Sequence, residues 1–161
     1  MKNGMAKPDE KRMGNAKRRP RTSLRILVVE DHADTRRGLQ IFLNAVGYEA
    51  HFAGSIGEAL SAAAASDEAF DVLLSDLRLP DGSGWELLQR LRESGREPQR
   101  AVALSGWGSD NDLAKSQSAG FHVHLVKPPA PEALEAALRD AADAVQAQKT
   151  GLHGAASAES A

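Results

Sequence analysis

The sequence predicts an α/β fold, built on a five-stranded, parallel, doubly wound sheet with five helices. Between Leu24 and about Gln148, short apolar runs alternate with amphipathic stretches, which is typical of repeated β-α units around a parallel sheet. Five such units fit this span, whereas a closed barrel needs eight. Right-handed crossovers then place helices on both faces of an open sheet.

Each expected strand is a short apolar run that turn residues follow. The first run is almost wholly apolar, as in strands that are buried on both faces, and the second has the weaker pattern of an edge strand. The third ends directly at Asp76, and the residues 79–84 beyond it are turn-forming. The strands are expected at residues 24–29, 48–53, 72–75, 101–104 and 121–126.

Helical periodicity and end signals fill the spaces between the strands. Gly47 stands where the first helix should end in a left-handed residue, and Ser55 with Glu58 forms a capping box for the second. Ser109 begins the fourth helix, and Pro131 lies in the first turn of the fifth. The expected inward residues are Leu39, Phe42, Leu43 and Val46, then Ile56, Ala59, Leu60 and Ala63, then Trp85, Leu88 and Leu91, and finally Leu134, Leu138, Ala141 and Val145.

Composition divides the chain into one domain and two tails. Residues 1–22 carry a net charge of +6 within a chain of net charge −2, so we expect a basic, disordered tail with at most weak polyanion contacts. Residues 23–148 form the domain. Residues 149–161 are rich in Ala, Ser and Gly and are expected to be a flexible tail.

The composition also limits the cellular setting. The chain has no Cys, which excludes disulfides and thiolate chemistry, and it has no apolar stretch long enough to span a bilayer. The basic start has no apolar segment of a secretory signal. We therefore expect a cytoplasmic protein without membrane contacts.

Polar residues stand where four of the predicted strands end. They are Glu30 and Asp31 after the first, Asp76 after the third, Ser105 after the fourth and Lys127 after the fifth. Ligands of open parallel sheets bind at this carboxyl edge. Gathered carboxylates repel one another unless a cation lies among them, and Mg²⁺ prefers oxygen ligands and also accepts phosphate oxygens.

This constellation suits phosphoryl transfer to a carboxylate. Asp76 can attack phosphorus to form an acyl phosphate, while Mg²⁺ and Lys127 supply positive charge to the incoming oxygens. The hydroxyl of Ser105 can then donate to the attached phosphoryl group. Each residue alone has an ordinary structural explanation, so the prediction depends on their occurring together.

Four motifs extend this pattern over nearly the whole predicted domain. They are ILVVED at 26–31, DVLLSDLRLPDGSG at 71–84, LSG at 104–106 and LVKP at 125–128. In this order and at β-α spacing, they resemble the receiver domains of response regulators, both the single-domain, chemotaxis-type members and the receivers fused to hybrid histidine kinases. The resemblance implies the flavodoxin-like strand order 2-1-3-4-5.

The resemblance also implies roles for single residues. Asp76 corresponds to the phospho-acceptor, Ser105 to the switch hydroxyl and Lys127 to the lysine that contacts the phosphoryl group. The implied Mg²⁺ ligands are the carboxylates of Glu30, Asp31 and Asp76 and the backbone carbonyl of Arg78. The Lys127-Pro128 bond is cis in many relatives.

Two positions depart from the family pattern. His124 stands where many members carry the Tyr or Phe that changes rotamer on activation, so we expect the switch to signal differently. Glu30 stands where many have Asp, which keeps the charge and is compatible with metal binding.

We expect the other histidines, His32, His51, His122 and His153, to be structural or surface residues. Trp107 and the Arg78 side chain lie near the expected mouth, where we hypothesise that they obstruct hydrolytic water.

The leading functional interpretation is a stand-alone response regulator of a two-component system or phosphorelay. A histidine kinase or hybrid kinase donates, Asp76 accepts, and the change alters binding to a downstream protein; apart from its own phosphorylation and slow dephosphorylation the chain is not an enzyme. We expect no DNA-binding domain. One alternative is an interaction module that has lost the chemistry, which His124 supports. The other is an aspartate-nucleophile phosphatase, but position 78 lacks the second Asp that is usual there.

Overall fold

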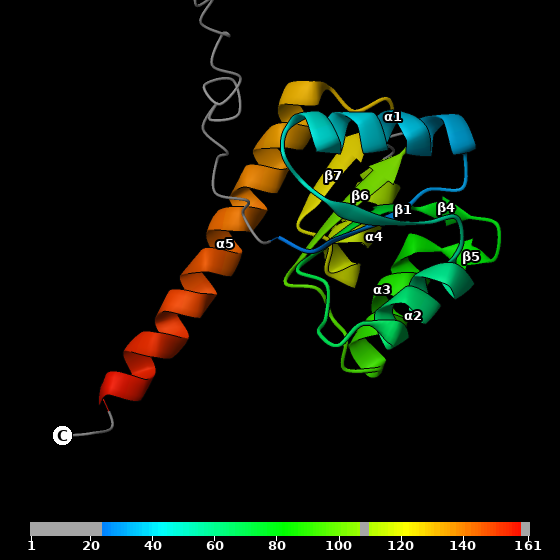
Figure 1. Cartoon of the computed structure of the whole chain (residues 1–161). Helices are drawn as coiled ribbons and strands as arrows, with labels where there is room; N and C mark the ends of the chain where they lie inside the picture. Colours follow the sequence, from blue (N-terminus) through cyan, green and yellow to red (C-terminus); the bar gives the residue numbers. More distant parts are fainter. Residues whose placement is uncertain (1–23, 107–109, 159–161) are drawn as a thin grey trace, which may run out of the picture.

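A five-stranded parallel sheet organises the molecule, in the order β2-β1-β3-β6-β7 (Figure 1). The computed structural model describes residues 24–106 and 110–158. The strands of this sheet are β1 (Ile26–Val29), β2 (Ala50–Ala53), β3 (Val72–Asp76), β6 (Arg100–Ser105) and β7 (Val123–Val126). The order corresponds to 2-1-3-4-5 among the main strands, so the predicted fold class and strand order are confirmed.

Helices cover both faces of the sheet. In Figure 1, α1 and α5 lie on one side of it and α2 and α3 on the other. The helices are α1 (Ala33–Ala45), α2 (Ile56–Ala65), α3 (Gly84–Glu93), α4 (Asp110–Ala119) and α5 (Pro131–Ala158). The expected beginning of the fourth helix at Ser109 lies outside the described residues.

The central strands divide the apolar core in two. Along β1, Leu27 and Val29 pack with α2 and α3, whereas Ile26 and Val28 pack with α1 and α5. This alternation follows from the two-residue period of a strand. β1 and β3 are buried over their whole lengths, which was predicted for β1 and is typical of strands that helices cover on both sides.

Helix ends largely follow the sequence signals. Gly47 adopts φ 90° after α1, and the amide of Tyr48 donates to the carbonyl of Leu43, which closes the helix end. At α2, the Ser55 hydroxyl accepts from the Glu58 amide, but the Glu58 carboxylate accepts from the amide of Gly54 rather than that of Ser55. The capping box therefore differs from the usual form in one bond, because the Glu58 carboxylate binds the amide that precedes the N-cap residue.

The turn after β3 contains more structure than the sequence predicted. Within the expected turn, β4 (Arg78–Leu79) and β5 (Gly82–Ser83) pair antiparallel in a small second sheet. The hairpin leads into α3, where the Gly84 amide donates to the carbonyl of Leu77. A Cβ at Gly84 would lie 2.6 Å from the carbonyl oxygen of Asp76, so this return to the sheet edge requires glycine.

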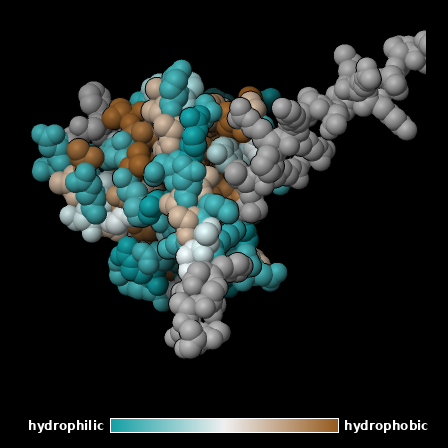
Figure 2. All heavy atoms as spheres, turned by 90° about the vertical axis from the view of Figure 1, so that its left-hand side faces the viewer, coloured by the Kyte–Doolittle hydropathy of each residue, from teal (hydrophilic) through white to brown (hydrophobic). Residues whose placement is uncertain are grey.

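The last helix extends past the expected end of the domain. The tail was expected from residue 149, and α5 continues to Ala158, with its outer end projecting from the rest of the molecule in Figure 1. Val145 is its last buried residue, and 146–151 are exposed. Between Gln146 and Lys149 the exposed residues are good helix formers, which favours continuation of the helix there. Figure 2, seen from the left-hand side of Figure 1, shows mostly hydrophilic side chains with smaller apolar areas among them.

The described helices contain no segment that is long and apolar enough to cross a membrane. The expected basic tail at 1–22 lies outside the described residues.

We predict that Gly84→Ala destabilises the protein by about 1–3 kcal/mol, because the added methyl group overpacks against the backbone of Asp76. Gly38 is the matched control. It lies inside α1 with no atom within 4 Å of an added Cβ, so Gly38→Ala should stabilise the protein by about 0.5–1 kcal/mol. Urea unfolding measures both, and equal effects of the same sign would contradict the packing argument.

Candidate functional site

The side chains predicted to form the site meet at the carboxyl edge of the sheet. Asp76 is the last residue of β3 and is only 5% exposed. Glu30 and Asp31 follow β1, Ser105 ends β6, and Lys127 follows β7. Parallel strands bring these positions together because all their carboxyl ends lie at one edge.

The Lys127 ammonium joins two of the carboxylates. Its Nζ atom lies 2.7 Å from Oδ2 of Asp76 and 3.0 Å from Oε2 of Glu30. Partial burial works against the charged amine, but the hydrogen bonds and charges of Asp76 and Glu30 outweigh it and raise the pKa of Lys127 above 10.5. The ammonium is therefore held charged beside Asp76. The Lys127-Pro128 peptide bond that follows is cis, as the resemblance implied.

The acidic pair after β1 forms a second cluster. Glu30 is completely buried, and its Oε1 accepts from the His32 amide at 3.1 Å. Ligand atoms of Glu30, Asp31 and His32 lie within 4.8 Å of one another. Oδ1 of Asp31 is buried and has no hydrogen-bond partner among residues 24–106 and 110–158. A buried carboxylate oxygen without a donor fits a hard cation, so these residues fit Mg²⁺.

Backbone contacts fix the positions of these carboxylates. The Arg36 guanidinium, in the first turns of α1, donates to the carbonyl of Glu30 at 2.8 Å. The Arg78 amide donates to Oδ1 of Asp76 at 3.2 Å, which holds the Arg78 backbone beside the carboxylate. Buried Ser75 donates its hydroxyl to the Asp76 carbonyl at 2.9 Å.

Ser105 lies at the same edge with a partner from the neighbouring strand. Its Oγ atom is 2.6 Å from Nε2 of His124 on β7. The backbone amide of Lys127 also donates to the Ser105 carbonyl, at 2.7 Å. The Ser105 hydroxyl, the expected switch group, is thus hydrogen-bonded to β7, the strand that Lys127 follows.

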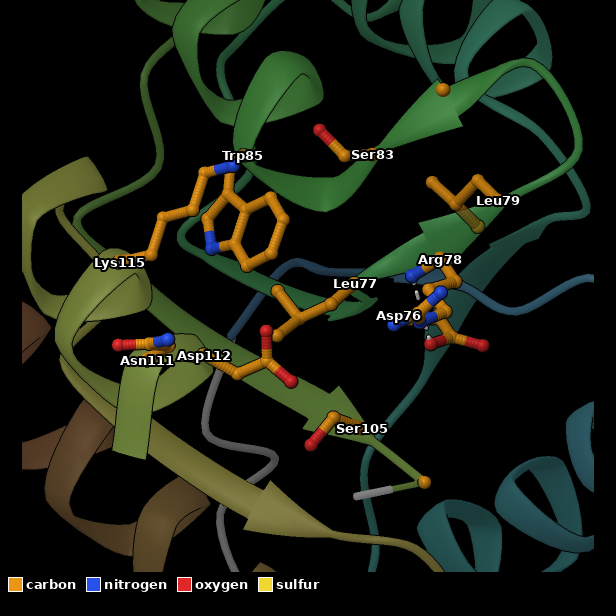
Figure 3. Close-up of a pocket in the computed structure, with 12 residues that line it drawn as sticks. Asp76, Leu77, Arg78, Leu79, Ser83, Trp85, Ser105, Asn111, Asp112 and Lys115 are labelled. Atoms are coloured by element: carbon orange, nitrogen blue, oxygen red, sulfur yellow. Dashed lines mark hydrogen bonds between the residues drawn. The ribbon is translucent and has the colours of Figure 1, made fainter. Parts of the chain in front are cut away.

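A cavity of about 680 Å³ opens beside Asp76, between β3, α3 and α4 (Figure 3). Trp85 and Lys115 line its far side, with the Lys115 ammonium 4.1 Å from the centre of the indole ring. Trp85 is half-buried and donates from Nε1 to Ser116, which confirms the predicted packing role. Trp107 lies outside the described residues, so the hypothesis that it obstructs water stays a prediction.

The remaining histidines differ in their surroundings. Nδ1 of His122 accepts from the Ala101 amide at 3.1 Å, and burial, followed by the charge of Arg100, lowers its pKa. This structural role was expected. His51 lies near Phe70, with ring centres 6.1 Å apart. The side chain of His153 lies outside the described residues.

Asp81 connects the loop after β3 to the beginning of α2 by hydrogen bonds. Its two carboxylate oxygens accept from the amides of Ile56 and Gly57, at 2.8 and 2.9 Å, at the beginning of α2. These bonds lower the pKa of the Asp81 carboxyl below its ordinary value of 3.8. The loop that carries Arg78 is thereby tied to α2.

Three residues around the site were not predicted from the sequence to lie there. His32, expected to be structural, lies in the acidic cluster; its place next to Asp31 was the available signal. Arg36 and Asp81 gave no signal beyond their residue types, because their partners are backbone groups that only the folded chain brings within reach.

Comparison with known proteins identifies the family. The sequence model of the response regulator receiver domain matches residues 26–139, more than half of the chain. The chain belongs to this family. Receiver domains are phospho-acceptor signalling proteins of two-component and phosphorelay systems, and their phosphoryl transfer depends on Mg²⁺.

Individual relatives support the assignment over the domain. The response regulator protein PilR of Pseudomonas aeruginosa is 37% identical over 103 residues, which are 63% of this chain and 22% of PilR. The virulence sensor protein BvgS of Bordetella pertussis is 33% identical over 129 residues, 76% of this chain and 10% of BvgS. The chain thus spans a small part of these relatives. The chemotaxis response regulator CheY4 of Vibrio cholerae matches with a TM-score of 0.66 and 28% identity, over 73% of this chain and 98% of CheY4.

We predict that Asp81 stabilises the fold in a pH-dependent way. Because its folded pKa is lowered, its contribution is complete above 3.8 and is lost as the pH falls through the folded value. Asp81→Ala should therefore be less stable than the original protein at neutral pH, and the difference should shrink in acid. Urea unfolding over this pH range measures it, with the exposed Asp67→Ala as control. A difference that is independent of pH would contradict the capping role.

We predict that Asp31→Asn weakens Mg²⁺ binding by roughly tenfold or more, since changes even in groups that only support metal ligands typically cost this much. The reason is that the buried Oδ1 of Asp31 has no other partner. Mg²⁺ titration followed by tryptophan fluorescence measures the effect. Asp34→Asn, an exposed acid in the first turn of α1, is the control and should leave the affinity within twofold. Equal losses in both variants would point to general electrostatics instead.

Proposed function

We propose that this chain receives a phosphoryl group on Asp76 from a histidine kinase or hybrid kinase and changes its binding to a downstream protein as a result. The observation that carries this proposal is the Lys127 ammonium, which contacts both Asp76 and Glu30. It supplies a fixed positive charge where an incoming phosphoryl group needs one.

The proposed reaction uses the Asp76 carboxylate as the nucleophile. One Asp76 oxygen forms a bond to phosphorus while the bond from phosphorus to the donor histidine nitrogen breaks, and that nitrogen retains the bonding electrons and regains a proton. Lys127 stays protonated throughout and stabilises the phosphoryl oxygens. The Arg78 amide, which donates to Asp76 Oδ1, keeps the carboxylate oriented.

Mg²⁺ would be held by Glu30, Asp31 and Asp76 and the backbone carbonyl of Arg78. When bound, it neutralises charge on the phosphoryl oxygens. Supporting this set are the buried, unpartnered Oδ1 of Asp31 and the full burial of Glu30. The lysine contact explains how two carboxylates remain close before the ion arrives.

The phosphorylated site would favour an arrangement that the protein already samples, through a hydrogen bond from Ser105. We propose that the readout surface combines α4, β7 and α5, where the large side chains of Leu113 and Val126 are 42% and 50% exposed. We also propose that the domain spans 23–148, that the chain acts as a stand-alone regulator in the cytoplasm, and that slow dephosphorylation ends the signal.

Neither alternative function gains support from the site. A module that had lost the chemistry would need no charged side chain at position 76, whereas Lys127 contacts the Asp76 carboxylate as well as that of Glu30. A phosphatase of the aspartate-nucleophile type needs a second carboxylate near position 78, where an exposed Arg stands instead.

We predict that Asp76→Asn abolishes labelling by acetyl phosphate with Mg²⁺, since an amide cannot form the acyl phosphate. Phosphate-affinity gels or intact-mass measurement would follow the added phosphoryl group. The control is Asp67→Asn, an exposed acid of the loop before β3, which should be labelled like the original protein. Undiminished labelling of Asp76→Asn would overturn the assignment of the acceptor.

A further inference from the structure

The Ser105 hydroxyl points away from Asp76, although it is expected to form a hydrogen bond with a phosphoryl group on that residue. Ser105 is 6% exposed, and its Oγ atom lies 2.6 Å from Nε2 of His124. In Figure 3 this oxygen points away from the Asp76 carboxylate, although both side chains lie at the same edge. A hydrogen bond from Ser105 to a phosphoryl group on Asp76 therefore requires the hydroxyl to turn.

The His124 ring depends on the same contact. Its Nδ1 atom is buried and has no hydrogen-bond partner within the part of the chain that the structure describes. Nε2 is thus the nitrogen through which the half-buried ring is satisfied, and its partner is Ser105. Breaking this bond would leave the second ring nitrogen without its protein partner, which costs free energy in a half-buried ring.

We propose that His124 is a positioning residue that holds the Ser105 hydroxyl toward β7 until phosphorylation draws it to Asp76. This inference rests on the proposed function and concerns its regulation. Phosphorylation must exchange the bond between Ser105 and His124 for one between Ser105 and the phosphoryl group. His124 thereby opposes activation and sets how far phosphorylation shifts the equilibrium.

The proposal predicts the sign of a substitution. His124→Phe keeps a ring but cannot form a hydrogen bond with Ser105. The substitution therefore destabilises the inactive arrangement, in which this bond exists, and leaves the active arrangement, in which it is absent, unchanged. The equilibrium should shift toward the active arrangement by roughly two- to tenfold, the range of one net hydrogen bond.

The experiment uses beryllofluoride with Mg²⁺ as a probe that imitates the phosphoryl group on the whole chain, with occupancy followed by ¹⁹F NMR. His124→Phe should lower the half-saturating beryllofluoride concentration by roughly two- to tenfold. The same substitution in a Ser105→Ala background should change it less than twofold, because the hydroxyl is gone. A merely structural effect of the ring would persist in that background.

Two further variants separate the hydrogen bond from the ring. Gln places an amide group near the position of Nε2, whereas the shorter Asn places it near that of Nδ1. His124→Gln should therefore bind beryllofluoride like the original protein, and His124→Asn should behave like His124→Phe. His51→Phe, on β2, controls for the loss of an exposed histidine and should change nothing.

The outcomes distinguish the two proposals. If the original protein binds no beryllofluoride with Mg²⁺, the proposed phospho-acceptor function fails. If it binds and His124→Phe binds equally or more weakly, the function stands and the restraint by His124 is overturned. Weaker binding would mean that His124 supports the Ser105 hydroxyl in the active arrangement. A His124→Phe effect of the same size with and without Ser105 overturns it as well.

Discussion

Two carboxylates and one ammonium, contributed by three strands, impose the main constraint on this fold. Glu30 is completely buried, and a buried carboxylate is stable only beside a compensating charge or good donors. Lys127 supplies that charge and shares it with Asp76. β7 is separated from β3 by β6, two strand spacings or about 10 Å, so the side chains of Lys127 and Asp76 must both extend across β6 to meet. The ion pairs form only when β7, β6, β3 and β1 are paired in this register, because a shift of β7 would move Lys127 away from the carboxylates.

The loops around this edge are shaped to leave the carboxylates in place. After β3 the chain turns away and returns as α3, and the return passes so close to the Asp76 carbonyl that only glycine fits at position 84. Asp81 then anchors the hairpin to the amides that begin α2. Arg36 holds the other side of the site through the Glu30 carbonyl. Three elements outside the sheet thus restrain the backbone that carries the acidic groups.

The fold and the five charged or hydroxyl positions were readable from sequence, because both depend on local patterns. Apolar period and turn residues located the strands, and parallel topology alone makes their carboxyl ends converge. The small sheet of β4 and β5 was not predicted, since two-residue strands have no period to detect. The continuation of α5 beyond residue 148 was missed because Gly and Ser in 151–158 suggested a loose tail. The bond between His124 and Ser105 was also beyond reach, because it depends on side-chain direction across two strands. The sequence flagged the unusual histidine but not its partner.

β7 receives both sets of contacts that phosphorylation is expected to change. It is an edge strand, paired only with β6 in the main sheet, and it is only partly buried. Lys127 directly follows β7 and forms the ion pairs with Asp76 and Glu30, and His124 lies within β7 and bonds Ser105. A phosphoryl group on Asp76 would recruit the lysine and the Ser105 hydroxyl together, so both changes would act on one strand. An edge strand can shift at lower cost than a central one, because it has fewer ladder bonds and less buried surface to disturb. In the proposed switch, the physical route from Asp76 to a partner surface would run most directly through β7, and His124, the residue that departs from the family pattern, lies on that strand.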